Sequence, residues 1–515
     1  MNNEEAIDYI IDKLQNGGKN LKVLKNEVAR KFKLKQVLKN SEIIERIKER
    51  KIITNFKLLK KPMRTLSGVT PVAVMIKPEK SCLYKCIFCP FTGRAAKSYT
   101  GDEPAARRSI DNGFDPYKQV KMRLNQFNIG GHSTDKCEVI VMGGTFLAMD
   151  EEYKNYFIKN IYDACNCKKS TNIKNAKKIN ETAEHRIVGL TIETRPDVCT
   201  TKHIDEILEF GATRIELGVQ NPDDEIYKIT KRGHLTKHVV ESTKNLKDAC
   251  FKIVYHLMPG QPGSNREKDI EMVKKVFENP DFKPDMLKIY PTLVIPKTEL
   301  YTMMHQGKYT PYTSEQAAEI ISEFYRYIPK YVRVMRIQRD IPATNIAEGV
   351  KKSNLREMVE SKMREKGIVP KEIRYREIGL NKMDFKSADF EIKRMDYEAS
   401  LGKEIFLSFE NKDDSIIAGF LRLRIPGKSH RKEIDSKTAL IRELHIYGQE
   451  LDVGKRETKK AQHKGLGREL LEMAEKIAKE EFGKTKMVII AGTGVREYYF
   501  KLGYKRAGPY VKKNL

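Results

Sequence analysis

Three cysteines, Cys82, Cys86 and Cys89, fall within the segment SCLYKCIFCP in the spacing C-x3-C-x2-C. A structural zinc ion takes four ligands, and the nearest further candidates, His132 and Cys137, are distant in the chain. A [4Fe–4S] cluster is also bound by thiolates, and three of them would leave one iron open for a small molecule. The spacing therefore favours a cluster with an open iron over a structural zinc ion.

A second candidate site lies in the segment AQHKGLGREL near the carboxyl end of the chain. Gln462, Gly465 and Gly467 form the pattern Q-x-x-G-x-G where a helix is predicted over about 464–482. Glycines let the backbone approach a pyrophosphate, and a helix N-terminus stabilises its negative charge. The pattern is weak alone, but a predicted strand before it and the segment YYFKLGY after the next strand strengthen it.

The elements that must position the cysteines are strands and helices that alternate between about residues 70 and 340. Strands separated by amphipathic helical segments predict βαβ units and a parallel sheet. The seven predicted strands are 72–76, 138–142, 187–192, 214–219, 252–258, 286–291 and 332–337. This set fits a full or partial β/α barrel, in which the chemistry gathers at the carboxyl ends of the strands.

Four of these strands end in residues that suit a binding site. The ends are GGTF from Gly143, ETRPD from Glu193, Gln220, and PGQPG from Pro259. Glycine and proline also end strands for steric reasons, yet four such ends together favour a functional interpretation. The cysteine segment follows the first strand, so we expect it at the same mouth of the barrel.

The pattern changes after residue 340. Residues 341–387 are predicted to connect two domains, and antiparallel-type strands follow from about residue 388. A long helix, a further strand and a short helix complete the segment. This order indicates a small α+β domain at the carboxyl end.

The chain of 515 residues carries 97 Lys and Arg against 70 Asp and Glu, a formal net charge of +27. Between Lys19 and Arg64 there are 16 basic and 4 acidic residues, a net of +12. Leu21, Leu24 and Val28 recur there at helical spacing, which predicts short basic helices with a packed face. The charge favours a polyanionic partner such as nucleic acid; a generally lysine-rich proteome is the alternative explanation.

The sequence suggests a cytoplasmic protein. No secretory signal is visible, and no apolar run approaches the roughly 18 residues that a membrane helix needs. In that compartment disulfides are rare. The remaining cysteines are predicted to be ordinary thiols: Cys137, Cys165, Cys167, Cys199 and Cys250.

These motifs resemble two known families. The three-cysteine motif, with Phe88 before its last cysteine, resembles radical S-adenosylmethionine (SAM) enzymes, and Q-x-x-G-x-G resembles the coenzyme A loop of GNAT acetyltransferases. With MRTLSGVTPVAVM, VMGGTF, IETRPD, HLMPGQPG, IRELHIYG and GPYVKK, the chain from about residue 60 onward closely resembles the catalytic subunits of Elongator. The resemblance implies a basic helical tRNA-binding module (1–64), a radical SAM partial (β/α) barrel (65–340), a connector (341–387) and an α+β GNAT domain (388–515).

The resemblance also implies a set of site residues. A [4Fe–4S] cluster would be held by Cys82, Cys86 and Cys89, and SAM by Gly143, Gly144, Thr145, Glu193 and Gln220. Acetyl-CoA would be bound by Lys136, Glu443, Leu444, His445, Ile446, Gln462, Gly465, Leu466 and Gly467. Tyr498 and Tyr499 are the catalytic candidates at the thioester. Adjacent helical residues point apart, so we expect only one to face it, and Tyr499 is preferred.

The sequence departs from this family at two points. Many eukaryotic relatives place one more residue between the first two cysteines. Some relatives carry an extra zinc site between the domains, but no cysteine follows Cys250 here to match it, so we do not predict one.

The activity that the resemblance implies is modification of uridine 34, the wobble base in the anticodon stem-loop of tRNA, to 5-carboxymethyluridine. The resemblance implies that the cluster, reduced by an electron donor, and SAM would together activate the acetyl methyl group of acetyl-CoA for addition to C5 of the base. Two alternatives are a protein lysine acetyltransferase with a structural iron–sulfur domain, and a tRNA-binding scaffold with decayed sites. The intact cysteines and Q-x-x-G-x-G argue against decay, and the basic charge favours tRNA over lysine-rich protein tails.

Overall fold

A computed structural model describes residues 3–16, 21–34, 36–50, 52, 67–79, 82, 84–381, 389–447 and 465–515. Gln462, predicted to bind acetyl-CoA, lies outside the described residues. None of the described helices has the length and apolar character needed to cross a membrane.

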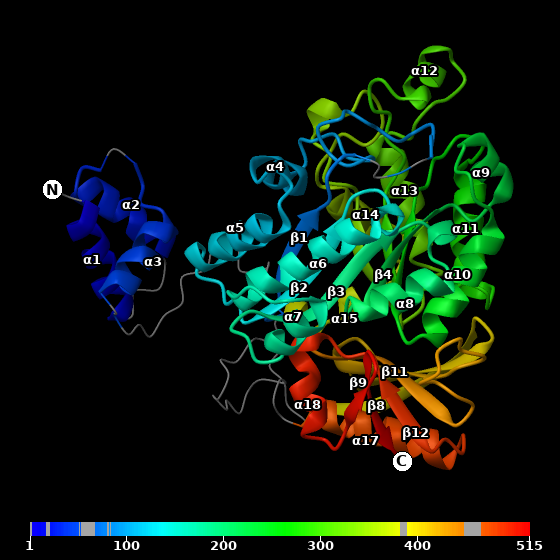
Figure 1. Ribbon diagram of the computed structural model, residues 1–515. Helices are drawn as coiled ribbons and strands as arrows, with labels where there is room; N and C mark the ends of the chain where they lie inside the picture. Colours follow the sequence, from blue (N-terminus) through cyan, green and yellow to red (C-terminus); the bar gives the residue numbers. More distant parts are fainter. Residues whose placement is uncertain are drawn as a thin grey trace.

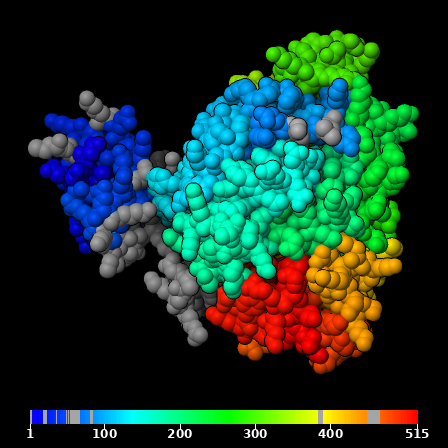
Figure 2. Space-filling model, viewed as in Figure 1, coloured from blue at the N-terminus to red at the C-terminus, as the bar shows by residue number. Residues whose placement is uncertain are grey.

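The basic N-terminal segment forms three short helices, α1 (Asn3–Gln15), α2 (Leu21–Lys31) and α3 (Asn40–Glu49). Their apolar faces meet in a small core of their own, which includes Ile10, Val28 and Ile43. Figures 1 and 2 show this module as a separate lobe beside helix α5 of the main body. Because the apolar side chains pack against each other, most of the charged side chains are left on the outside of the lobe.

The next part of the chain is an open barrel of seven parallel strands that pair in chain order. They are β1 (Thr70–Met75), β2 (Lys136–Met142), β3 (Arg186–Thr194), β4 (Arg214–Gln220), β5 (Lys252–Leu257), β6 (Met286–Ile289) and β7 (Arg333–Ile337). The barrel is open because β1 and β7, within the described residues, are not paired with each other. The seven predicted strands and the partial (β/α) barrel are confirmed.

Helices cover the outside of the barrel strands (Figure 1). They are α4 (Pro104–Asp111), α5 (Pro116–Ile129), α6 (Glu151–Asn166), α7 (Ile173–Asn180), α8 (Thr201–Glu209), α9 (Asp224–Ile229), α10 (Thr236–Asp248), α11 (Arg266–Glu278) and α13 (Ser314–Phe324). Helix α12 (Glu299–His305) instead projects beyond the barrel near the cysteine segment, where Leu300 N–H donates to the carbonyl of Ile87. Several begin with a side-chain cap, such as Asn265 before α11 and the Thr313–Gln316 capping box of α13. The strands are therefore covered on the outer face, which explains their nearly continuous burial.

A second sheet of seven strands forms the carboxyl-terminal domain, in the order β13-β14-β12-β11-β10-β9-β8. Its elements are β8 (Phe390–Ala399), β9 (Gly402–Asn411), β10 (Ile417–Ile425), β11 (Thr438–Ile446), α17 (Leu466–Glu480), β12 (Lys486–Ile489), α18 (Arg496–Phe500), β13 (Lys505–Ala507) and β14 (Tyr510–Asn514). Strands β11 and β12 are parallel, and the other pairs are antiparallel. The sequence did not predict β8 and β14: β8 is an edge strand rich in charged residues.

The segment expected to be a connector also packs on the barrel. It contains α14 (Leu355–Glu365), α15 (Ile373–Arg376) and α16 (Ile378–Asn381). Glu372 accepts a hydrogen bond from the Val334 backbone N–H, and Glu377 pairs with Arg333 at 2.8 Å. Residues 355–381 are therefore anchored to β7 and do not form a free linker.

The carboxyl-terminal sheet lies against the amino-terminal ends of the barrel strands (Figure 1). Arg442 of β11 donates to the carbonyl of Phe251, just before β5, and to Asp285, just before β6. A Cβ on Gly494 would lie 2.5 Å from Arg186, the first residue of β3. Because Gly494 has no side chain, the acetyltransferase domain packs directly against the start of β3 at this point. The carboxyl-terminal ends of the barrel strands, where the cysteine segment lies, are at the opposite end of the barrel.

Candidate active site

A cavity of about 520 Å³ opens at the carboxyl ends of the barrel strands. All three motif cysteines line it, together with residues from the ends of β2, β3 and β4. Of the residues predicted to bind SAM, the cavity is lined by Gly144, Thr145, Glu193 and Gln220. The topology brings these segments together because parallel strands present their carboxyl ends at one edge.

The cysteine segment is held against the barrel by its backbone. Ile87 N–H donates to the carbonyl of Thr230 at 3.2 Å, and Cys89 N–H donates to the carbonyl of Cys86 at 3.0 Å. Burial, with the neighbouring Cys86 and Cys82 thiols, raises the pKa of Cys89 to about 12. Without a metal this group is therefore a neutral thiol at pH 7, and metal binding would have to displace its proton.

Two residues that line the cavity, Thr145 and Gln220, have buried polar atoms without a hydrogen-bond partner among the described residues. These atoms are Thr145 Oγ1 and Gln220 Oε1. Gln220 also has a backbone φ of 66°, an unusual conformation for a residue other than glycine. Buried polar atoms normally find partners, so a polar ligand here would satisfy them. The donor set of three thiols and these orphaned atoms fits a cluster with a polar small molecule beside it.

Gly143, unlike Gly144, is packed against other parts of the chain and does not line the cavity. Its φ is 119°, and an added Cβ would lie 2.8 Å from both Ala96 and Ile76. This glycine therefore allows the end of β2 to pack against the segment that follows the cysteines.

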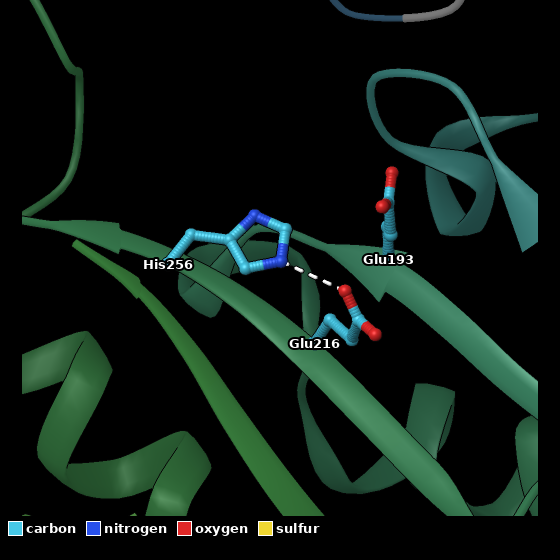
Figure 3. Close-up of side chains that lie close together, drawn as sticks. All are labelled: Glu193, Glu216 and His256. Atoms are coloured by element: carbon cyan, nitrogen blue, oxygen red, sulfur yellow. Dashed lines mark hydrogen bonds and ion pairs between the residues drawn. The ribbon is translucent and has the colours of Figure 1, made fainter. Parts of the chain in front are cut away.

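Figure 3 shows Glu193, Glu216 and His256 on three adjacent strands, with the side chains of Glu216 and His256 turned toward each other and that of Glu193 beside them. His256 Nε2 lies 2.8 Å from Glu216, and Tyr99 Oη donates to Glu193 at 3.1 Å. One ligand atom from each of the three residues lies within 4.8 Å of the others, a spacing that a metal ion could use. Here, however, the Lys288 ammonium pairs with Glu216 and lies 3.7 Å from Glu193.

The electrostatics of this group follow from Lys288. Burial opposes the charged form of Glu216, but the Lys288 ammonium and the His256 hydrogen bond outweigh it and hold the pKa of Glu216 well below its usual range. Burial likewise opposes the Lys288 charge, yet Glu216 raises the pKa of that ammonium. We therefore assign an ion-pair network and not a metal site.

The sequence interpretation missed Glu216, His256 and Lys288. The signal was present: each is a polar residue inside an otherwise apolar strand, in RIELGV, KIVYHLM and MLKIYP. Charged residues are almost never fully buried unless paired. Opposite charges within β4 and β6, the two buried strands on either side of β5, could therefore have predicted that the two side chains meet.

The predicted coenzyme A loop leads into α17. Gly465 has a φ of 90° and caps the helix, and its carbonyl accepts from Arg468 and Glu469. An added Cβ on Gly467 would lie 3.2 Å from the Tyr498 hydroxyl and 3.6 Å from Ile446. Residues of β11 and α18 therefore flank this helix N-terminus.

The remaining acetyl-CoA candidates divide into two groups. Leu444 and Ile446 of β11 lie beside Gly467. Glu443 points to the other side of the strand, where it accepts from Arg422 at 2.9 Å, and His445 stacks on Phe420 with 5.9 Å between ring centroids. The Leu466 side chain is buried in the core.

Lys136 belongs to the barrel. It is the first residue of β2, opposite Arg186 in the register of the parallel strands β2 and β3, at the end of the barrel that faces the acetyltransferase domain.

The two adjacent tyrosines of α18 have different surroundings. Tyr498 is 41% exposed and its hydroxyl lies at Gly467, whereas Tyr499 is 7% exposed and packs edge-on against Tyr504. Burial raises the pKa of both phenols. These positions favour Tyr498 as the tyrosine at the coenzyme A loop, which differs from the preference drawn from the sequence.

Comparison with family models matches four parts of the chain. The Radical SAM superfamily matches residues 76–276, and the Radical_SAM C-terminal domain matches 284–365. The ELP3 N-terminal domain matches 3–66, and the acetyltransferase (GNAT) family matches 380–504. The fold and the site thus define a radical SAM protein that carries an acetyltransferase domain.

Individual relatives cover nearly the whole chain. A protein of Methanocaldococcus jannaschii named tRNA uridine(34) acetyltransferase is 53% identical over 92% of this chain and 90% of its own length. Human Elongator complex protein 3 is 42% identical over 89% and 86%. The structure of archaeal Methanocaldococcus infernus Elp3 with an N-terminal deletion (1-46) superposes with a TM-score of 0.79 at 49% identity, covering 88% of this chain and all of that chain. The chain belongs to this family of tRNA uridine(34) acetyltransferases and Elongator subunits.

Proposed function

We propose that this protein modifies the wobble uridine 34 of tRNA to 5-carboxymethyluridine, with acetyl-CoA as the carbon source. One observation carries the proposal: a single barrel has a three-cysteine cavity at one end and an acetyltransferase sheet fixed to the other. Relatives that align with 89–92% of this chain are named tRNA uridine(34) acetyltransferase. The matched families support SAM, an iron–sulfur cluster and acetyl-CoA as the groups involved.

At the barrel mouth, Cys82, Cys86 and Cys89 would hold a [4Fe–4S] cluster, which with SAM supplies a 5′-deoxyadenosyl radical when both are bound. The chain's own residues bind and orient around that chemistry. Thr145 and Gln220 offer buried polar atoms to the SAM molecule. Glu193, fixed by Tyr99 and Lys288, presents a carboxylate to the same cavity.

At the other domain, the N-terminus of α17 would bind the pyrophosphate of acetyl-CoA. Backbone N–H groups there are aligned with the helix dipole, which favours a negative charge. Tyr498 Oη beside Gly467 is placed to donate a proton to a thiolate that leaves the thioester. The hydrolysis of that thioester would leave the carboxylate of the product.

The tRNA would be bound by the basic N-terminal module, whose charge suits phosphate contacts that are independent of sequence. A base in an anticodon loop is accessible because loop bases can leave the stack. The reaction also needs a one-electron donor, and we propose a cytoplasmic location because the substrate is tRNA.

The alternative, a protein lysine acetyltransferase with a structural iron–sulfur domain, is not favoured. The relatives that cover the chain are named for tRNA uridine(34) or Elongator, and a net charge of +27 opposes binding to lysine-rich protein tails. A decayed scaffold is also not favoured, because the three cysteines and Gly465 and Gly467 are all present.

The proposal is tested by anaerobic reconstitution with iron and sulfide. The protein is then incubated with SAM, acetyl-CoA, dithionite and tRNA, and nucleosides are analysed by mass spectrometry. We expect 5-carboxymethyluridine from the native chain and neither this product nor a reduced-cluster EPR signal from Cys82→Ala, Cys86→Ala or Cys89→Ala. Cys167→Ala is the control, since this exposed cysteine is not among the residues that line the cavity. Stoichiometric zinc without iron, or acetyl groups on protein lysines and none of the nucleoside, would contradict the proposal.

A further inference from the structure

Two buried guanidinium groups contact the sulfur of Cys86. Arg232 Nη1 lies 3.5 Å from Cys86 Sγ, and Arg195 Nη1 lies 3.9 Å from it. Arg195 follows β3, and Arg232 lies in the loop between α9 and α10. They are 2% and 7% exposed. A buried cation is unfavourable unless an anion or several acceptors compensate it, so the partners of each guanidinium decide its role.

Arg195 already has an acidic partner. Its Nε and Nη2 donate to the two carboxylate oxygens of Asp197 at 3.0 and 3.1 Å, and Nη2 also donates to the carbonyl of Arg232. The Tyr84 ring covers the guanidinium face, with 3.6 Å between Cζ and the ring centroid. These contacts fix the guanidinium so that its Nη1 is directed at the sulfur.

Arg232 has no such partner. Within the described part of the chain, no aspartate or glutamate oxygen forms an ion pair with it. Its Nε donates to His234 Nε2 at 3.2 Å, and its Nη2 donates to the carbonyl of Gly218 at 2.5 Å. Burial, with the charge of Arg232, lowers the pKa of His234 to about 3, so this imidazole is neutral and adds no counter-charge. Of the described groups in hydrogen-bond contact with the Arg232 guanidinium, only Cys86 can become an anion.

The surrounding backbone is shaped for this side chain. A Cβ on Gly218 would lie 2.7 Å from Arg232 Nη2. Gly233, with a φ of 77°, leaves space for the Tyr84 ring, which would be 2.6 Å from an added Cβ. The guanidinium thus occupies a fitted position beside the cysteine and is not a surface side chain that happens to point inward.

We propose that Arg232, assisted by Arg195, sets the reduction potential of the cluster that Cys86 would help to hold. The inference rests on the proposed function only in requiring that cluster. One-electron reduction by an external donor adds one negative charge to the cluster and breaks no bond. N–H donors and positive charge at a ligand sulfur favour the form with the additional electron. Arg232 therefore raises the potential and makes the cluster easier to reduce.

The test compares the reconstituted full-length proteins by EPR-monitored redox titration without SAM. We expect Arg232→Gln to weaken the affinity of the cluster for the electron at least tenfold, a fall in potential of at least about 59 mV for a one-electron couple. Arg232→Lys keeps the charge and should shift the potential less. Arg195→Gln should also shift it less, since Asp197 already offsets that charge. Lys231→Gln is the matched control: it removes a neighbouring charge that is exposed and paired with Glu299 at 2.6 Å.

An unchanged potential in an Arg232→Gln protein with full iron content would overturn the inference. A change that appears only after SAM is added would also overturn it, because it would show that the guanidinium binds SAM. If the Arg232→Gln protein holds no iron, the Arg232→Lys and Arg195→Gln proteins are used for the test instead. Cluster potentials equal to the native value in both of them would reject the inference. Native protein that lacks iron would refute the proposed function itself, whereas native protein that makes the nucleoside with unshifted variants would refute only this inference.

Discussion

The guanidinium of Arg442, in the acetyltransferase sheet, lies 2.6 Å from the carboxylate of Asp285, in the barrel, and both side chains are fully buried. Arg442 also pairs with Glu404 at 2.9 Å, and Lys247 of the barrel lies 3.5 Å from Glu404. Burial disfavours the charge of Asp285, but the Arg442 guanidinium holds the pKa of this carboxyl well below its usual range. A buried ion pair therefore joins the two halves of the chain. The Arg442 and Asp285 charges are paired with each other only when the two domains are packed together.

Removing one partner of this contact should be strongly destabilising. Asp285→Ala leaves the Arg442 charge buried without its main counter-charge, which should cost about 3–5 kcal/mol of unfolding free energy. Denaturant unfolding would measure this loss. Arg468→Ala, which breaks an exposed pair with Glu472 at 2.7 Å, serves as the control and should cost less than about 1 kcal/mol. A double replacement, Asp285→Leu with Arg442→Met, should be better tolerated than Asp285→Ala, and the reverse order would argue against the ionic interpretation.

The coenzyme A loop can be tested at Gly465. Gly465→Glu places a negative charge where the pyrophosphate should approach and forces a side chain into a φ of 90°. We expect acetyl-CoA binding, measured by calorimetry, to be lost while the iron content and EPR signal stay native. Gly483→Glu introduces the same charge at another glycine of positive φ (60°), with no atom within 4 Å of an added Cβ. Equal loss of binding in both variants would mean that the effect is general strain.

Replacing Tyr498 and replacing Tyr499 should have different effects on the rate of thioester hydrolysis. Tyr498→Phe removes the hydroxyl at Gly467, and if that group donates a proton to the leaving thiolate, thioester hydrolysis should slow by about 10²–10⁴-fold. Tyr499→Phe should have a much smaller effect on this rate, because its ring is buried against Tyr504. Release of free coenzyme A from acetyl-CoA in the presence of tRNA is the measurement. A larger effect at Tyr499 would restore the preference drawn from the sequence.

Deletion of residues 1–64 should weaken tRNA binding while leaving SAM and acetyl-CoA binding intact. Binding by the full chain should fall by orders of magnitude between roughly 50 and 200 mM salt, because phosphate contacts release counterions. The truncated chain should show a shallower slope. Filter binding over this salt range gives both slopes, and identical slopes would place the tRNA contacts elsewhere on the protein.

Asp269 gives a prediction about pH. It is fully buried and accepts hydrogen bonds from Gly260 N–H, Ser264 and Tyr312, yet burial outweighs these and raises its pKa from 3.8 to about 6. A raised pKa of an acid means that the folded state binds the proton more tightly than the unfolded state does. The stability that Asp269 contributes to the folded state is therefore complete below about pH 4, and it is lost as the pH rises through 6.

Relative to Asp269→Asn, the native protein should therefore lose about 3 kcal/mol of unfolding free energy between pH 4 and 7, since each pKa unit corresponds to about 1.36 kcal/mol. Urea unfolding of both proteins over this range measures the difference. Parallel pH profiles, or a native protein that gains stability with rising pH relative to the variant, would contradict the assignment.

Local patterns were sufficient for much of this protein. Seven strands, the cysteine segment after the first of them and the glycine-bounded helix near residue 465 could be predicted from the sequence, because hydrophobic period and turn chemistry act over a few residues. The edge strand β8 could not, since its charged, half-exposed residues resemble a loop. Likewise, helical periodicity indicated that only one of Tyr498 and Tyr499 could face a ligand, but which one depends on how α18 packs against α17 and β11.

The sequence by itself determined the chemistry that each segment can perform: three thiolates in C-x3-C-x2-C, glycines before a helix, and a basic N-terminus. Only the tertiary structure decided which groups meet. Arg195 and Arg232 are 109 and 146 residues away from Cys86 in the chain, yet both contact its sulfur, and Asp285 meets Arg442 across 157 residues. Such pairings arise because parallel strands bring their carboxyl ends to one edge and their amino ends to the other. A buried charge then takes the partner that this arrangement brings within reach, whatever its distance in the sequence.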